Sequence, residues 1–190
     1  AKGELLALAE TGDAARLLAR AGPYADRWPT LRPVAADSLR ALATRLHQQH
    51  RYRETRRLLN AAAQFAPADR ETEMLAAWNL LQLGETRAAA NAFMTLYADE
   101  PDTSSAEGVL TSLRRLGDDA ALARLARSPG PLHRLWRQDQ AKRFVARGDL
   151  VRAYRIDPNV SPSLANVDSS AAALGARWRE RSGEPGLGRL

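Results

Sequence analysis

Residues 70–103 have the sequence RETEMLAAWNLLQLGETRAAANAFMTLYADEPDT, and this stretch decides the fold. Apolar residues recur at helical spacing in its first half, at Leu75, Trp78, Leu80 and Leu81. Gly84 can adopt the left-handed conformation that ends a helix, and the acid of Glu85 can accept from the free amides that open the next one. Pro101 then stops the second helix. The stretch therefore predicts two helices joined by a tight turn.

The turn motif, a glycine followed by an acid, recurs along the chain. The pairs are Gly12-Asp13, Gly84-Glu85, Gly117-Asp118 and Gly148-Asp149. The last three glycines are spaced by 33 and 31 residues, while the first gap of 72 residues leaves room for one further unit, with its turn at His50-Arg51-Tyr52. Pro67 and Pro101 are 34 residues apart. A period of this length indicates a helical repeat architecture.

Residues 70–103 resemble the tetratricopeptide repeat, a helix pair with small residues where its two helices cross. On this resemblance Ala77 and Ala89 are the crossing residues, and Phe93 is the aromatic of the second helix. Residues 36–69 resemble it as well, with Leu59 at the position of Phe93 and His50 in place of the turn glycine. The resemblance implies an all-α fold, a right-handed superhelical stack of antiparallel helix pairs, with at least seven helices and no sheet.

We expect one helical repeat domain over residues 1–156, followed by a loop-rich segment, 157–190, with a terminal helix at about 169–181. The repeat domain comprises capping helices (1–33), the two best repeats (36–69 and 70–103) and degenerate repeats (104–156). A proline-marked connection through Gly22-Pro23, Pro29 and Pro33 is expected to follow the first helices. Ser104 and Glu107 have the spacing of a capping box.

The first helix of each tetratricopeptide pair lines a concave groove. The residues that the resemblance places there are Arg40, Thr44 and His47 from the first full unit, Glu71, Met74, Trp78 and Gln82 from the second, and Arg114 and Arg115 from the third. Met74, Trp78 and Gln82 are four residues apart and share one side of a helix. Trp78 either anchors a partner in the groove or packs against the neighbouring pair. Arg40 and His47 would favour an acidic ligand.

Catalytic and cofactor motifs are not found in the sequence. There is no cysteine, which excludes disulfides and thiol catalysis. No Walker loop, G-x-S-x-G, H-E-x-x-H or dinucleotide turn occurs. His47 and His50 are spaced as neighbours on a helix, but no third histidine or nearby acid completes a metal site. We therefore expect no enzyme, no cofactor and no bound metal.

The positive charge is concentrated toward the C-terminus. Residues 131–190 hold 11 Lys and Arg against 6 Asp and Glu, and so carry five of the net six positive charges. A solvated helix face explains these arginines better than an anion site does, and a nucleic-acid partner is not favoured. No apolar run approaches the roughly 20 residues that span a bilayer, so membrane insertion is not expected. The absence of cysteine leans toward the periplasm over the cytoplasm.

These features together predict a non-catalytic scaffold that binds a peptide or a partner protein in its groove. The alternative is a periplasmic module that assists export of an anionic polymer, because bacterial exopolysaccharide-export proteins contain repeat arrays that resemble this one. A polymer binder should expose arginines interleaved with aromatics along one groove. A peptide binder should have a mixed apolar and polar groove centred on Met74 and Trp78.

Overall fold

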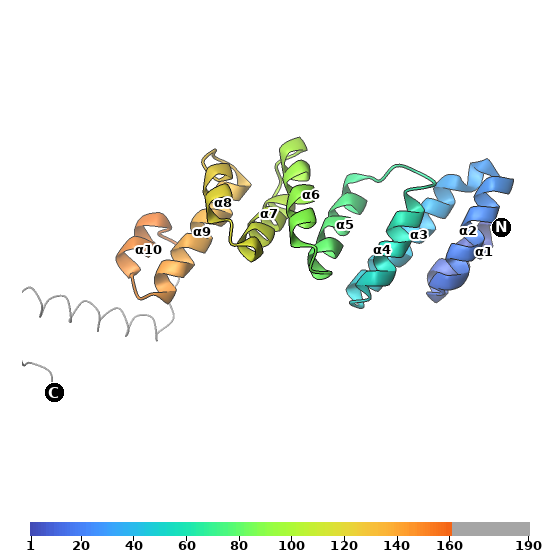
Figure 1. Ribbon diagram of the computed structural model, residues 1–190, viewed down its shortest axis with the longest axis horizontal. Coiled ribbons are helices and arrows are strands. Elements are labelled where there is room, and N and C mark those ends of the chain that lie inside the picture. The colour runs from blue at the N-terminus through green and yellow to red at the C-terminus, as the bar shows by residue number, and fades with distance from the viewer. Residues whose placement is uncertain (161–190) are drawn as a thin grey trace, which may run out of the picture. The chain divides into compact units, whose positions relative to one another are not determined.

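The computed structural model describes residues 1–160, and every regular element in that range is a helix (Figure 1). The α-helices are α1 (Lys2–Thr11), α2 (Ala14–Arg27), α3 (Arg32–Gln48), α4 (Tyr52–Ala62), α5 (Arg70–Gln82), α6 (Thr86–Asp99), α7 (Thr103–Leu116), α8 (Asp119–Leu125), α9 (Pro131–Ala146) and α10 (Leu150–Ile156), with one 3-10 turn, η1 (Pro29–Leu31). The prediction of an all-α protein without strands is confirmed for this part of the chain. The helix expected at 169–181 lies outside the described residues.

The chain forms two compact units, Ala1–Leu122 and Ala123–Leu190. Within the first unit, each helix from α1 to α6 packs against the next one along the chain. The odd-numbered helices also contact one another, α1 with α3, α3 with α5 and α5 with α7. In the second unit, α9 packs against α10, around a small core that contains Ala141, Val145 and Ala153.

The five predicted turns have the expected backbone conformation. Gly12, Gly84, Gly117 and Gly148 have φ values of 81°, 83°, 71° and 75°, and His50 takes the glycine's place with φ 61°. Only the aspartates among the following acids cap the next helix: Asp13, Asp118 and Asp149 accept from the amides of Arg16, Ala121 and Arg152. The capping role expected of Glu85 is wrong, because its carboxylate pairs with Arg56 on α4 instead.

The contact between α6 and α7 depends on a glycine. Phe93 of α6 is fully buried, and a Cβ placed on Gly108 of α7 would lie only 2.2 Å from the Phe93 Cδ1 atom. The absence of a side chain at Gly108 therefore makes room for the aromatic ring. Ala77 and Ala89, the expected crossing residues of α5 and α6, are also fully buried.

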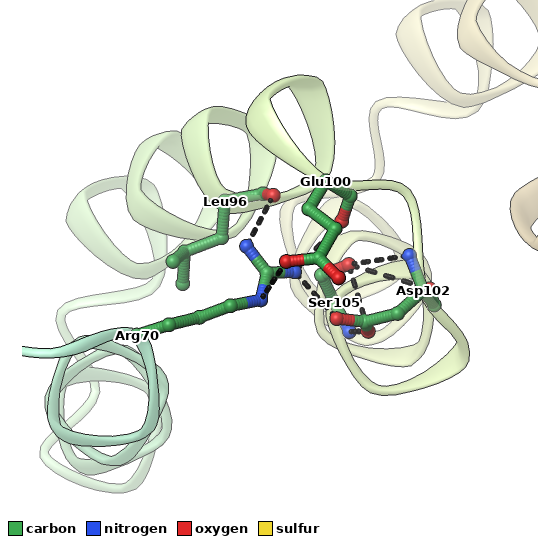
Figure 2. Close-up of polar contacts among 5 residues, drawn as sticks. All are labelled: Arg70, Leu96, Glu100, Asp102 and Ser105. Atoms are coloured by element: carbon green, nitrogen blue, oxygen red, sulfur yellow. Dashed lines mark hydrogen bonds and ion pairs between the residues drawn. The ribbon is translucent and has the colours of Figure 1, made fainter.

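Arginines tie the C-terminal ends of helices to other helices. Arg70, at the start of α5, donates to the carbonyl oxygens of Leu96 (3.0 Å) and Glu100 (2.7 Å) at the end of α6 (Figure 2). It also hydrogen-bonds Asp102, which caps α7 by accepting from the Ser105 amide at 2.7 Å. Similar donor–carbonyl contacts are Arg40 to Ala66 and Pro67, Arg45 to Glu10, Arg115 to Leu81 and Arg137 to Ile156. Except for Ala66 and Pro67, which follow α4, these acceptors lie at helix C-terminal ends, where a cation complements the partial negative charge.

Two expected boundaries differ from the structure. The capping box of α7 is formed by Asp102 and Ser105, not by Ser104 and Glu107. Pro23 does not open a connection but lies inside α2, where it costs one backbone hydrogen bond. Ala21 and Ala25 are both buried on either side of it, so tertiary packing maintains the helix through the proline. Within the residues expected to form degenerate repeats, α8 has only 7 residues.

Candidate functional site

A cleft of about 390 Å³ lies between α3 and α5 in the first unit. Its α3 side is formed by Asp37, Arg40, Ala41 and Thr44. Its α5 side is formed by Asp69, Glu71, Thr72, Met74, Leu75 and Trp78. The volume falls within the range of about 300–1,000 Å³ that is typical of ligand pockets.

Helical periodicity aligns the residues on both walls. Positions 37, 40, 41 and 44 follow the i, i+3, i+4, i+7 spacing of one helix face, and positions 71, 74, 75 and 78 repeat it on α5. Asp69 is the N-cap of α5 and accepts from the Thr72 amide at 2.8 Å. This cap fixes the first turn of α5, which carries Glu71 into the cleft wall.

Trp78 packs within its own helix pair, α5–α6, and not against the neighbouring pair, and it also lines the cleft. Its ring packs edge-to-face against Phe93, with centroids 4.8 Å apart and planes at 66°. The side chain is only partly buried and lines the cleft together with Met74. Since Phe93 is itself fully buried beside Gly108, the indole is held by the core on one side and faces the cleft on another.

Arg40 is engaged by the protein itself. Its guanidinium donates to the carbonyl oxygens of Ala66, at 3.2 Å, and Pro67. It also pairs with Asp37 at 3.3 Å and with Asp69 at 4.0 Å, and only 15% of its side chain is exposed. The expectation that Arg40 attracts an acidic ligand therefore changes, because its charge already faces two carboxylates and two carbonyl dipoles.

The exposed charges of the cleft are acidic. The side chains of Asp37 and Asp69 are 72% and 64% exposed, and Glu71 is exposed as well. Hydrogen bonds from the side chain and the backbone of Thr72 lower the pKa of Asp69 below its ordinary value, against a smaller opposing effect of burial. Asp69 is therefore ionised throughout the physiological pH range.

The cleft brings together five of the nine residues expected in the groove, namely Arg40, Thr44, Glu71, Met74 and Trp78. The other four lie elsewhere. His47 is directed to Asn79, at 3.4 Å, and its ring contacts Tyr52. Gln82 is exposed at the end of α5.

The two arginines expected from the third unit stabilise helix ends. Arg114 pairs with Asp119 at the start of α8. Arg115 donates to the carbonyl oxygen of Leu81 at 3.0 Å. Neither residue lines the cleft, because both lie on α7 and the cleft is formed by α3 and α5.

Sequence reasoning missed half of the cleft lining, including Asp37, Ala41 and Asp69. The first two could have been found, since they lie three residues before and one residue after Arg40 on the same helix face. Asp69 belongs to the connection before α5, and its place in the cleft follows from the tertiary contact of α3 with α5. No sequence period predicts that contact for a connecting residue.

The two closely spaced histidines share a tyrosine. The Nδ1 atom of His50 lies 2.6 Å from the hydroxyl oxygen of Tyr52, and the His47 ring packs edge-on against the same tyrosine. Within residues 1–160, no three His, Asp or Glu side chains are grouped closely enough to hold a metal ion. None of the described helices is long and apolar enough to cross a membrane.

Several arginines of the second unit are engaged within that unit. Arg137 donates to the Ile156 carbonyl oxygen at 2.8 Å. Arg143 pairs with Asp139, and Arg152 pairs with Asp149 and lies over the Phe144 ring. These contacts agree with the interpretation that the arginines stabilise helix surfaces and ends.

The site is thus a recessed surface between two neighbouring helices, and its lining combines apolar side chains with three carboxylates and one arginine. No protein family model, no curated protein and no solved structure matches this chain.

Proposed function

We propose that this chain is a non-catalytic scaffold that binds a peptide or a partner protein in the cleft between α3 and α5. The observation that carries the proposal is the position of Trp78, which lines the cleft with Met74 while Phe93 holds its ring from behind. Partly exposed aromatics in a recess are common anchors in protein interfaces, because they bury a large apolar area at a small cost in side-chain entropy.

The proposed architecture is a right-handed superhelical stack of helix pairs of the tetratricopeptide kind. It is supported by the repeat period, by the left-handed turn residues and by the contacts of α1 with α3, α3 with α5 and α5 with α7. In such a stack the first helices of successive pairs form a continuous binding surface. The cleft between α3 and α5 is then one part of a longer groove.

The experiment that tests this function is a selection from a phage-displayed library of random dodecapeptides on the immobilised chain, with counter-selection on the Trp78→Ala variant. Selected peptides should bind the parent and lose about 2 kcal/mol or more with Trp78→Ala, roughly thirty-fold in Kd. Trp28→Ala is the matched control, because Trp28 is 39% exposed and lies outside the cleft. A selection without any Trp78-dependent binder would refute the function.

Thermal unfolding of the same variants separates binding from packing. If Trp78 contributed only to the core, Trp78→Ala would cost about 3–5 kcal/mol of stability. A variant that keeps its helical content and most of its melting temperature while losing the peptide supports an anchor in the cleft.

The alternative, handling of an anionic polymer, relies on the second unit. Arg134, Arg147 and Arg155 are exposed there. Titration with alginate at increasing salt tests this function, because counterion release makes polyanion binding strongly salt-dependent. A micromolar or tighter affinity that is lost when these three arginines are neutralised would favour the polymer over the peptide.

A further inference from the structure

The charge of the cleft is opposite to that of the whole protein. The chain carries a net charge of +6, whereas the cleft is lined by three carboxylates, Asp37, Asp69 and Glu71, and by one cation, Arg40. The unit that holds the cleft, Ala1–Leu122, does not share the positive charge, because it contains 15 Lys and Arg against 16 Asp and Glu. Three carboxylates against one cation therefore favour a basic ligand at this site and steer its approach.

Arg40 does not neutralise the three carboxylates of the cleft. The guanidinium of Arg40 is directed to the carbonyl oxygens of Ala66 and Pro67 and is largely buried, while Asp37 and Asp69 remain mostly exposed. Glu71 is exposed as well. The carboxylates consequently dominate the electrostatic potential that a ligand meets in the cleft.

Four residues of the cleft lining are apolar, namely Ala41, Met74, Leu75 and Trp78. We call these four residues the floor and the three carboxylates the rim. Lysine and arginine side chains combine a methylene stem, which can cover such a floor, with a charged head that reaches a polar rim. A cation near the partly exposed indole of Trp78 also gains a cation–π attraction, worth about 0.5–1 kcal/mol at an exposed site. The floor therefore fits the methylene stem of a lysine or arginine side chain, and the rim fits its charged group.

We propose that the occupant of this cleft is a basic peptide segment of a partner protein, with a lysine or arginine next to an apolar residue. The inference rests on the proposed function and adds the chemistry of the partner. The apolar residue lies against Met74 and Trp78, and the cation meets Glu71 and the exposed edges of Asp37 and Asp69.

The test uses three fluorescein-labelled peptides of one pattern, Gly-Xaa-Leu-Xaa-Leu-Xaa-Gly, with Xaa as arginine, glutamine or glutamate. Fluorescence anisotropy with the full chain should give a Kd for the arginine peptide at least roughly tenfold below that of the glutamate peptide. Added salt should weaken the arginine peptide and leave the glutamine peptide nearly unchanged, because exposed charges are screened.

Two matched variants locate the effect. Glu71→Lys should weaken the arginine peptide roughly tenfold, because it places a like charge in the rim. Glu73→Lys makes the same change of charge two residues away on α5, at an exposed position that does not line the cleft, and should leave the affinity within about twofold. Glu71 and Glu73 are both exposed in the first turn of α5, so the two charge reversals should cost similar stability and both variants should fold.

Each outcome decides the inference. If the glutamine or glutamate peptide binds as tightly as the arginine peptide and depends on Trp78, the basic partner is refuted and the peptide-binding function stands. Equal losses for Glu71→Lys and Glu73→Lys would refute the assigned site, because only the overall charge would then matter. If no peptide of the three binds, the inference also fails, and the library selection alone decides the proposed function.

Discussion

The helix pairs α3–α4 and α5–α6 have the same construction but reach it with different residues. Each has a turn residue at positive φ, but this is His50 in one pair and Gly84 in the other. Each first helix supplies an arginine that donates to carbonyl oxygens beyond or at the end of its second helix, Arg40 to Ala66 and Arg70 to Leu96. Backbone conformation and hydrogen-bond acceptors thus repeat more faithfully than the residue types do.

The interiors of the two pairs also differ. Position 93 of α6 is a fully buried phenylalanine, whereas the residue 34 positions earlier, Leu59 of α4, is smaller and 7% exposed. The larger ring is accommodated where α7 carries Gly108. The pair α5–α6 therefore has the more demanding packing, and substitutions there should have the larger effects.

The largest effect is expected for truncation of the two interior residues. Phe93→Ala should cost about 3–5 kcal/mol of stability, and Leu59→Ala about 2 kcal/mol, near the low end for buried leucines. Urea denaturation of both variants, followed by circular dichroism, measures the difference. Equal losses would contradict the tighter packing of the second pair.

A smaller effect is expected at the glycine that faces the ring. Gly108→Ala should cost about 1–3 kcal/mol by overpacking, although alanine is otherwise favoured over glycine in a helix. The same substitution in a Phe93→Leu background should cost less, because leucine, as at position 59, leaves more room. A double-mutant cycle measures this coupling, and strictly additive losses would show that the Phe93 ring is not the obstacle.

Substitutions at the two turn residues, Gly84 and His50, should differ in their effect on stability by about 1 kcal/mol. Gly84→Ala places a side chain at φ 83°, which costs about 1–2 kcal/mol. His50→Gly removes the same kind of strain but gives the unfolded chain more freedom, so a change of less than about 0.5 kcal/mol is expected. If His50→Gly destabilises as much as Gly84→Ala, the 2.6 Å contact of His50 with Tyr52 stabilises the turn more than glycine would.

The smallest effect is a pH dependence of the two N-caps. Hydrogen bonding from Arg70, followed by the Ser105 amide, lowers the pKa of Asp102, and Thr72 lowers that of Asp69. A carboxyl group whose pKa is lower in the folded state stabilises the fold above its ordinary pKa of 3.8, and this stability is lost as the pH falls through the folded value.

The matched variants are Asp102→Asn and Asp69→Asn, because asparagine retains the capping acceptor but cannot titrate. Both should flatten the loss of stability below about pH 4, and Asp102→Asn should flatten it more because Asp102 bonds directly to an arginine. Melting temperatures between neutral pH and pH 2 provide the measurement. If the melting temperature of Asp102→Asn falls with decreasing pH as steeply as that of the parent, the ion pair with Arg70 does not stabilise the folded state.

Local chemistry made the turns and helices predictable from the sequence, and longer-range contacts limited the rest. A glycine followed by an acid needs only its neighbours to form a turn, which is why Gly12, Gly84, Gly117 and Gly148 were recognisable. The α7 cap was misplaced because several residues near Asp102 can all accept from an amide. The burial of Asn79 against Tyr52 depends on helices far apart in the sequence.

The candidate cleft was predictable in part for the same reason. Met74 and Trp78 lie on one helix face, so helical period was enough to pair them. The engagement of Arg40 was not foreseeable, because its acceptors are the carbonyl oxygens of Ala66 and Pro67. Every residue has a backbone carbonyl oxygen, so the position of the acceptor cannot be recognised from the residue types.

Because any residue can supply a backbone carbonyl oxygen, these contacts affect how the sequence can diverge. A hydrogen bond from an arginine to backbone carbonyl oxygens constrains the identity of the arginine only. The donor must keep its planar guanidinium with several N–H groups, whereas the side chains of the accepting segment can change freely. Drift should therefore be rapid in the connection that follows α4 and slow at Arg40 and Arg70. Two homologues could then keep every arginine–carbonyl contact between their helices and still show little sequence identity when aligned.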